Sequence, residues 1–135
     1  MKSKNEDFLI GIITAFLFAS IITMLPVWQL IIIPGIIAGL LNKTMRRAAL
    51  AGGIGTLMAW SLYMISGLIL KNVYLIFNQF GALILGAGFG WLLIIIVFLM
   101  GFVFGVLGGV LGYLLNIVVI VNIRTTIERN SGEKL

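Results

Sequence analysis

Acidic residues are missing from almost the whole of this chain. The four that it has lie at its ends: Glu6, Asp7, Glu128 and Glu133. Basic residues are sparse between them, so that three stretches carry no charge at all: 8–42, 48–70 and 72–123. Because a membrane-spanning helix needs about 20 apolar residues, each stretch is long enough to cross a bilayer. The sequence predicts an integral membrane protein in the cell membrane, with the lipid bilayer as its first partner.

Cysteine and histidine are both absent. Disulfides, thiol chemistry and the common ligands of zinc, haem and iron–sulfur clusters are therefore excluded. The uncharged stretches also hold no carboxylate pair for acid–base catalysis and no Ser-His or Cys-His pair for nucleophilic catalysis. We therefore predict no catalytic residues, no metal site and no cofactor, and a protein that is not an enzyme.

Hydrophobic residues make up 61% of the chain, and the net charge is +5. The few basic residues form no dense stripe or nucleic-acid motif, so no nucleic-acid partner is predicted. They are better explained by membrane topology, because lysine and arginine hold loops on the cytoplasmic side. The predicted fold class is an all-α, polytopic bundle of transmembrane helices in a single domain.

The first uncharged stretch, 8–42, would form a helix of about 52 Å, too long for a hydrocarbon core of about 30 Å. Pro26 is the natural break, because proline lacks an N–H donor and clashes with the preceding turn. This predicts two short spans, at about 8–25 and 27–41, with Pro34 kinking the second. The alternative is that Pro26 only kinks one tilted helix.

A basic loop follows these spans and should face the cytoplasm: Lys43, Arg46 and Arg47. A third span is predicted at 48–70. The stretch 72–123 would make about 78 Å of helix, enough for two crossings.

Arg124 and Arg129 favour a cytoplasmic C-terminus, which requires an odd number of further crossings. The simplest solution has four spans, the last at 91–115. Residues 72–90 then form an outer or re-entrant segment, residues 116–135 a tail on the cytoplasmic side, and both termini are cytoplasmic. Five spans are the alternative.

Glycine is the most regular element of the sequence. Residues four apart share a helix face, and small residues there let two helix backbones approach closely. This spacing predicts glycine-zipper packing, either between copies of the protein or within one chain. The predicted packing residues are Gly35, Gly39, Gly101, Gly105, Gly108, Gly109 and Gly112.

Asn116 is the most notable polar residue near the last predicted span. An unpaired amide at membrane depth is costly, so we expect a hydrogen-bond partner or water there. A structural hydrogen bond is favoured over a ligand contact.

Three short motifs stand out: the Pro-Gly-Ile-Ile-Ala-Gly-Leu run at 34–40, the Ala/Gly-rich run at 48–55 and Gly-Gly-Val-Leu-Gly at 108–112. The first two resemble a small archaeal family of integral membrane proteins of unknown function, and the third fits the motif with which that family usually ends. The match covers about a third of the chain. The basic loop and the stretch 72–123 depart from the family's usual pattern. The resemblance implies four helices and no known activity.

These features predict a non-enzymatic membrane protein that self-associates as a homo-oligomer or serves as an accessory subunit of a membrane complex. The alternative is a small channel or transporter-like protomer, because a pore can be lined by backbone and uncharged side chains. A lipid-modifying enzyme or its subunit would need a catalytic residue from a partner.

Overall fold

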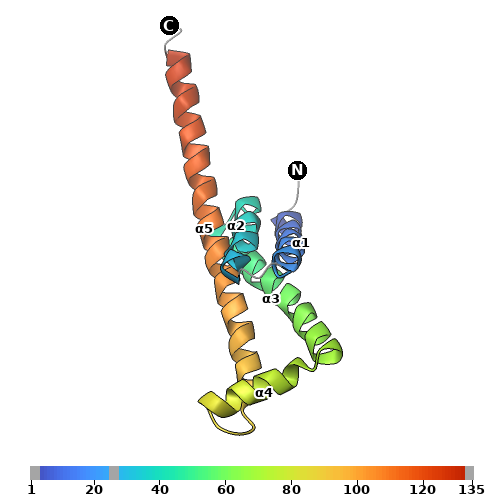
Figure 1. Ribbon diagram of the computed structural model, residues 1–135. Coiled ribbons are helices and arrows are strands. Elements are labelled where there is room, and N and C mark those ends of the chain that lie inside the picture. Colours follow the sequence, from blue (N-terminus) through green and yellow to red (C-terminus); the bar gives the residue numbers. More distant parts are fainter. Residues whose placement is uncertain (1–3, 25–27, 133–135) are drawn as a thin grey trace.

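A computed structural model describes residues 4–24 and 28–132 (Figure 1). These residues form five α-helices and one short 3₁₀ helix, and no strand occurs among them. The elements are α1 (Lys4–Ile22), η1 (Trp28–Ile31), α2 (Ile32–Leu41), α3 (Met45–Leu70), α4 (Val73–Ile84) and α5 (Gly90–Gly132). The predicted all-α fold class is confirmed.

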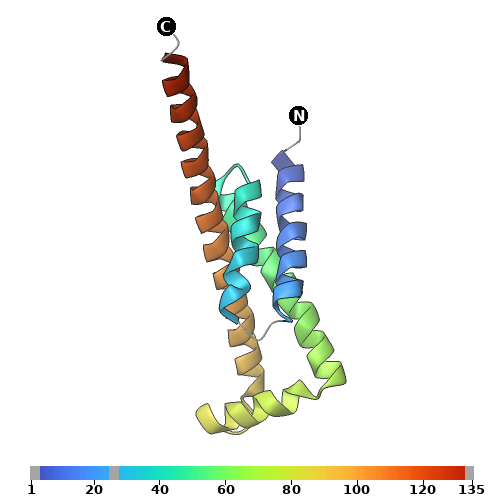
Figure 2. The same ribbon diagram turned by 45° about the horizontal axis from the view of Figure 1, so that its top comes forward.

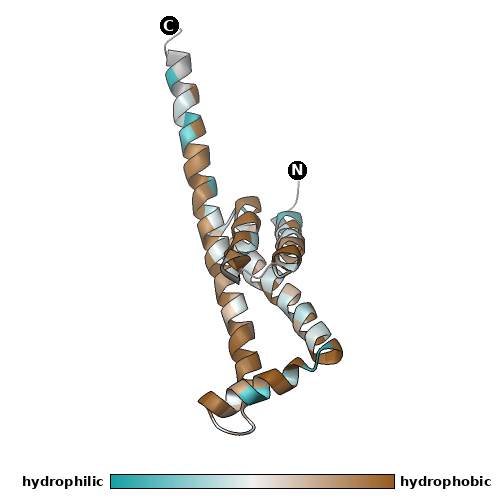
Figure 3. Ribbon diagram, viewed as in Figure 1, coloured by the Kyte–Doolittle hydropathy of each residue, from teal (hydrophilic) through white to brown (hydrophobic). Residues whose placement is uncertain are grey.

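Three segments are long and apolar enough to cross a membrane: Asn5–Ile22, Met45–Leu70 and Gly90–Ile127. Two apolar helices are shorter, α2 and α4. Apolar residues cover α5 over most of its length (Figure 3). The chain is thus compatible with a membrane protein, as its composition predicts.

The helices α1, α2 and α3 pack together beside α5 (Figure 2). The closest partners of α5 are α3 and α2, and α1 packs on α3 and α2. Both ends of the described chain point to the same end of the molecule, while α4 lies crosswise at the other end (Figures 1 and 2). The far part of α5 extends beyond the rest of the molecule.

Small residues fill the interior, and large apolar residues face outward. The buried hydrophobic residues are mostly alanines, with Ala15, Ala38 and Ala51 at the centre. Many leucine and isoleucine side chains are about half exposed, such as Leu9 at 56%. This arrangement suits lipid, where close backbone packing rather than the burial of large side chains brings helices together.

The second predicted span is the least regular part of the bundle. Pro26 lies outside the described residues. Pro34 stands third in α2, where its missing N–H removes no helical hydrogen bond, and the change from 3₁₀ to α-helix comes just before it. Together η1 and α2 measure about 23 Å, shorter than a hydrocarbon core of about 30 Å.

The stretch 72–123 contains two helices. After Asn72, whose φ is 49°, α4 runs to Ile84, and a turn with Gly86 and Gly88 at positive φ leads into α5. The last predicted span ends at 115, but α5 continues without interruption to Gly132. The segment after Asn116 is therefore a helical extension of the last predicted span.

Candidate functional site

One face of α5 lies directly against α2. A Cβ atom added to Gly35 would stand 2.5 Å from the carbonyl oxygen of Gly105, and one on Gly39 would overlap the carbonyl oxygen of Gly109. Gly108 and Gly112 would meet the carbonyl oxygens of Ile32 and Ile36 in the same way. Only glycine permits this backbone approach, because real Cβ atoms do not come so close to a carbonyl oxygen.

The same helix meets α3 along a neighbouring face. A Cβ on Gly105 would lie 2.5 Å from the Gly52 carbonyl oxygen, and one on Gly109 would overlap the carbonyl oxygen of Ala48. Nearer the start of α5, Gly101 packs on the ring of Trp60. A Cβ atom added to Gly101 would lie 2.8 Å from Trp60 Cε3.

All seven glycines singled out by their spacing thus lie at contacts between helices of one chain. The sequence left open whether they join two copies or pack a single chain. Since α2 and α3 occupy these faces of α5, contact between copies must use another surface.

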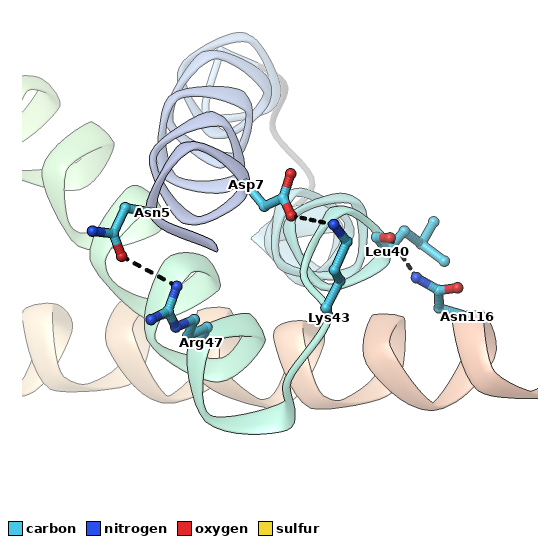
Figure 4. A network of polar contacts seen from close by, with 6 residues as sticks. All are labelled: Asn5, Asp7, Leu40, Lys43, Arg47 and Asn116. Atoms are coloured by element: carbon cyan, nitrogen blue, oxygen red, sulfur yellow. Dashed lines mark hydrogen bonds and ion pairs between the residues drawn. The ribbon is translucent and has the colours of Figure 1, made fainter. Parts of the chain in front are cut away.

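Charged and polar residues gather where α1 begins and α2 leads into α3 (Figure 4). Lys43 Nζ lies 2.9 Å from Asp7 Oδ2, and Arg47 Nη1 donates to Asn5 Oδ1 at 3.4 Å. The Asp7 side chain is largely buried, with 14% of its surface exposed, whereas 70% of the Lys43 side chain is exposed. These contacts tie the start of α1 to the predicted cytoplasmic loop.

Asn42 is the buried centre of this region, with 1% of its surface exposed. Its Nδ2 donates to the Ala38 carbonyl oxygen at 2.9 Å and closes the end of α2. A Cβ on Gly11 would overlap the same nitrogen, so α1 passes close to the amide. Asn42 Oδ1 has no hydrogen-bond partner within the described residues.

Asn116 does have a partner. Its Nδ2 donates to the carbonyl oxygen of Leu40 at 2.6 Å and joins α5 to the end of α2 (Figure 4). Beyond this contact, Arg124 and Arg129 are exposed on the extension of α5. The start of α3, where Arg46 and Arg47 stand, lies toward the same end of the molecule as both ends of the described chain (Figure 2).

A cavity of about 250 Å³ lies between the second half of α3, α4 and the start of α5. From α3 it is lined by Trp60, Tyr63, Met64 and Gly67. A hydroxyl at its edge, that of Thr23, already donates to the Ala19 carbonyl oxygen at 2.7 Å. The cavity therefore offers an apolar surface. The buried Trp60 Nε1 has no hydrogen-bond partner among the described residues.

The described part of the chain brings together no group of three or more His, Cys, Asp or Glu residues. No family model, no curated protein and no solved structure matches this chain. The resemblance to an archaeal membrane-protein family, and the expectation that the protein is not an enzyme, therefore stay predictions.

Two buried polar residues, Asn42 and Thr56, and the buried Nε1 atom of Trp60 were not singled out by their sequence pattern. The role of Asn42 could have been predicted from its position. It follows Ala38 by four residues at a helix end, where a side-chain amide can donate a hydrogen bond to a free carbonyl oxygen. Thr56 and Trp60 carried no such signal, because their burial depends on which face of α3 meets α5.

Proposed function

We propose that this chain is a non-enzymatic integral membrane protein that packs against another membrane chain, either a second copy of itself or a larger complex's subunit. The observation that carries the proposal is the extension of α5. From Ile117 to Ile123 this helix is apolar at every position except Asn122, and all seven residues are exposed.

The length of the helix supports this proposal. With 43 residues, α5 is about 64 Å long, roughly twice the thickness of a hydrocarbon core. The part after Asn116 accounts for about 24 Å of this length. It extends past α2 and the loop after it (Figure 1).

An apolar helix with no neighbour exposes its surface to the solvent, which is unfavourable in water. Ile120 has 56% of its surface exposed, and its neighbours Val119 and Val121 have 52% and 53%. Contiguous exposed apolar surface marks a site of contact with protein or membrane. A second membrane chain beside the extension would cover it.

We propose four crossings with both termini in the cytoplasm: α1, η1 with α2, α3, and α5. Two features support this topology. Both ends of the described chain point to one end of the molecule, toward which the basic loop also lies, and α4 lies crosswise at the other end (Figure 2). Single cysteines at 42–47 and after Arg129 should be labelled from the same side of the membrane. Labelling from opposite sides would contradict four crossings.

Association is tested by extracting the protein into nanodiscs directly from its membrane and measuring the mass of single particles. We expect particles that hold two or more copies, or one copy with a discrete second protein. Ile120→Asp should release the single chain, because an aspartate there cannot be buried without a large desolvation cost. Leu99→Asp is the matched control at an exposed position that is also on α5, and it should keep the association if it inserts. Single-chain particles from the unmodified protein would contradict the proposal.

A further inference from the structure

The cavity beside α3 is lined by one face of that helix. Gly67, Met64 and Trp60 line it from α3, at spacings of three and four residues that place them on one helix face. Opposite them stand Val73 and Phe77 of α4 and Val97 of α5. The cavity is thus a wedge between three helices.

Lys71 stands at the end of this face. It is four residues beyond Gly67, and its backbone N–H donates to the Gly67 carbonyl oxygen at 3.0 Å. From Lys71 to Trp60 the face is about 16 Å long, at 1.5 Å per residue. One leaflet of a hydrocarbon core is about 15 Å thick, half of about 30 Å. The length of α3 from Lys71 to Trp60 therefore matches the thickness of one leaflet.

The charge of Lys71 has no acidic partner among the residues that the structure describes. Lys71 is exposed and forms no ion pair among the described residues, and every acidic residue of the chain lies at one of its termini. The described termini are at the opposite end of the molecule from α4, which follows Lys71 directly (Figure 1). The anion that a membrane supplies at this depth is a lipid phosphate, and a lysine stem can reach it from an apolar surface.

We propose that the wedge binds one hydrocarbon chain of a membrane phospholipid, whose phosphate pairs with Lys71. The hydrocarbon chain of the lipid lies along Gly67 and Met64 and ends near Trp60. The proposal rests on the membrane embedding of the protein inferred above, but it does not depend on contact through the α5 extension. The bound lipid would fill the space between α3 and α5 and fix the position of α4 across their ends.

Native mass spectrometry of the full chain, released from detergent with added phosphatidylglycerol, measures the retained lipid. The unmodified protein should keep one lipid. Lys71→Gln should lower retention about fivefold, because a lysine near a phosphate contributes about 1 kcal/mol. Lys43→Gln, which removes a lysine from the other end of the molecule, is its matched control and should change nothing.

The wedge itself is tested by filling it. Gly67→Leu should displace the lipid chain, whereas Gly67→Ala adds one methyl group beside Val73 and should keep the lipid. Val97→Phe fills the wedge from α5 and replaces Gly67→Leu if that variant does not fold. Trp60→Phe should retain the lipid, because a hydrocarbon chain offers no acceptor to Nε1.

Three results would overturn the proposal: no lipid on the unmodified protein, equal retention after the charge is removed and the wedge is filled, or loss of lipid in Trp60→Phe. The last would indicate a ligand with an acceptor oxygen deep in the wedge. Ile120→Asp separates this proposal from the proposed function. It should keep the lipid while it loses association, and a lipid-free protein that still associates would contradict the lipid site alone.

Discussion

Both halves of α5 contain a long apolar run, but the two runs have opposite surroundings. From Gly90 to Gly112 the helix carries glycines that lie against α2 and α3, and Gly105 and Gly109 are buried. From Tyr113 to Ser131 it has no glycine, and residues 117–127 are exposed. The difference shows that hydropathy alone does not decide which part of this helix is packed.

Backbone access explains the difference. In the first half, the glycines let the carbonyl oxygens of α2 and α3 come as close as a missing Cβ permits. In the second half, Val118, Val119, Ile120 and Val121 follow one another, and their branched Cβ atoms keep another backbone at a distance. A partner of this half would have to pack side chain against side chain.

The largest loss of stability is expected from a substitution at a glycine in the packed half of α5. Gly109→Leu would push a side chain into the carbonyl group of Ala48, which cannot move without moving α3. We expect a loss of about 3 kcal/mol in unfolding free energy, at the upper end for overpacking. Thermal unfolding in detergent, followed by helical circular dichroism, measures it. Val103→Leu enlarges an exposed residue of the same half, 41% exposed, and should change little. Equal losses in the two variants would refute the packing account.

Asn116 marks the boundary between the halves and offers a smaller effect. Asn116→Leu removes the hydrogen bond from Nδ2 to the Leu40 carbonyl oxygen. Hydrogen bonds between membrane helices contribute about 0.6 kcal/mol on average, and up to about 2 kcal/mol, so we expect a loss within that range. The same unfolding measurement applies, with Leu115→Ala as a control at an exposed neighbour. A loss as large as that of Gly109→Leu would move the boundary of the packed region beyond Asn116.

The smallest effect is expected at Thr56, which is fully buried against Gly105. Its Oγ1 has no hydrogen-bond partner within the described residues. Thr56→Val keeps the shape and removes a buried polar atom, so stability should stay unchanged or rise by about 1 kcal/mol. Ser61→Ala removes a hydroxyl that donates to the Leu57 carbonyl oxygen and serves as the comparison. A clear loss in Thr56→Val would mean that Oγ1 has a partner, such as a buried water.

The sequence predicted the helical class, because it follows from a local pattern, and the glycine spacing predicted that these residues pack helices together. It could not predict which helices the glycines meet, since the approach of Gly35 to Gly105 joins residues far apart in the chain. The last span was predicted to end at 115 from the thickness of a bilayer, and α5 continues beyond that point as a helix.

The buried polar groups and the wedge also depend on contacts between helices that the sequence pattern does not reveal. Asn42 was not singled out from the sequence, yet its amide closes α2 and lies against Gly11 of α1. The wedge beside Trp60 depends on the crosswise position of α4, which no periodicity encodes. Charge parity indicated only that the segment 72–90 should not cross the membrane, a topology that stays a prediction.

The central claim is that a separate membrane chain covers the second half of α5, whereas the protein itself covers the first. A photo-crosslinking amino acid at Ile120, and in a separate variant at Leu99, tests it in native membranes. Both positions are exposed within the chain, at 56% and 61%. We predict that Ile120 forms a discrete protein adduct, containing a second copy or one defined partner, and that Leu99 reacts with lipid only. No protein adduct at Ile120, or the same adduct from both positions, would contradict the account.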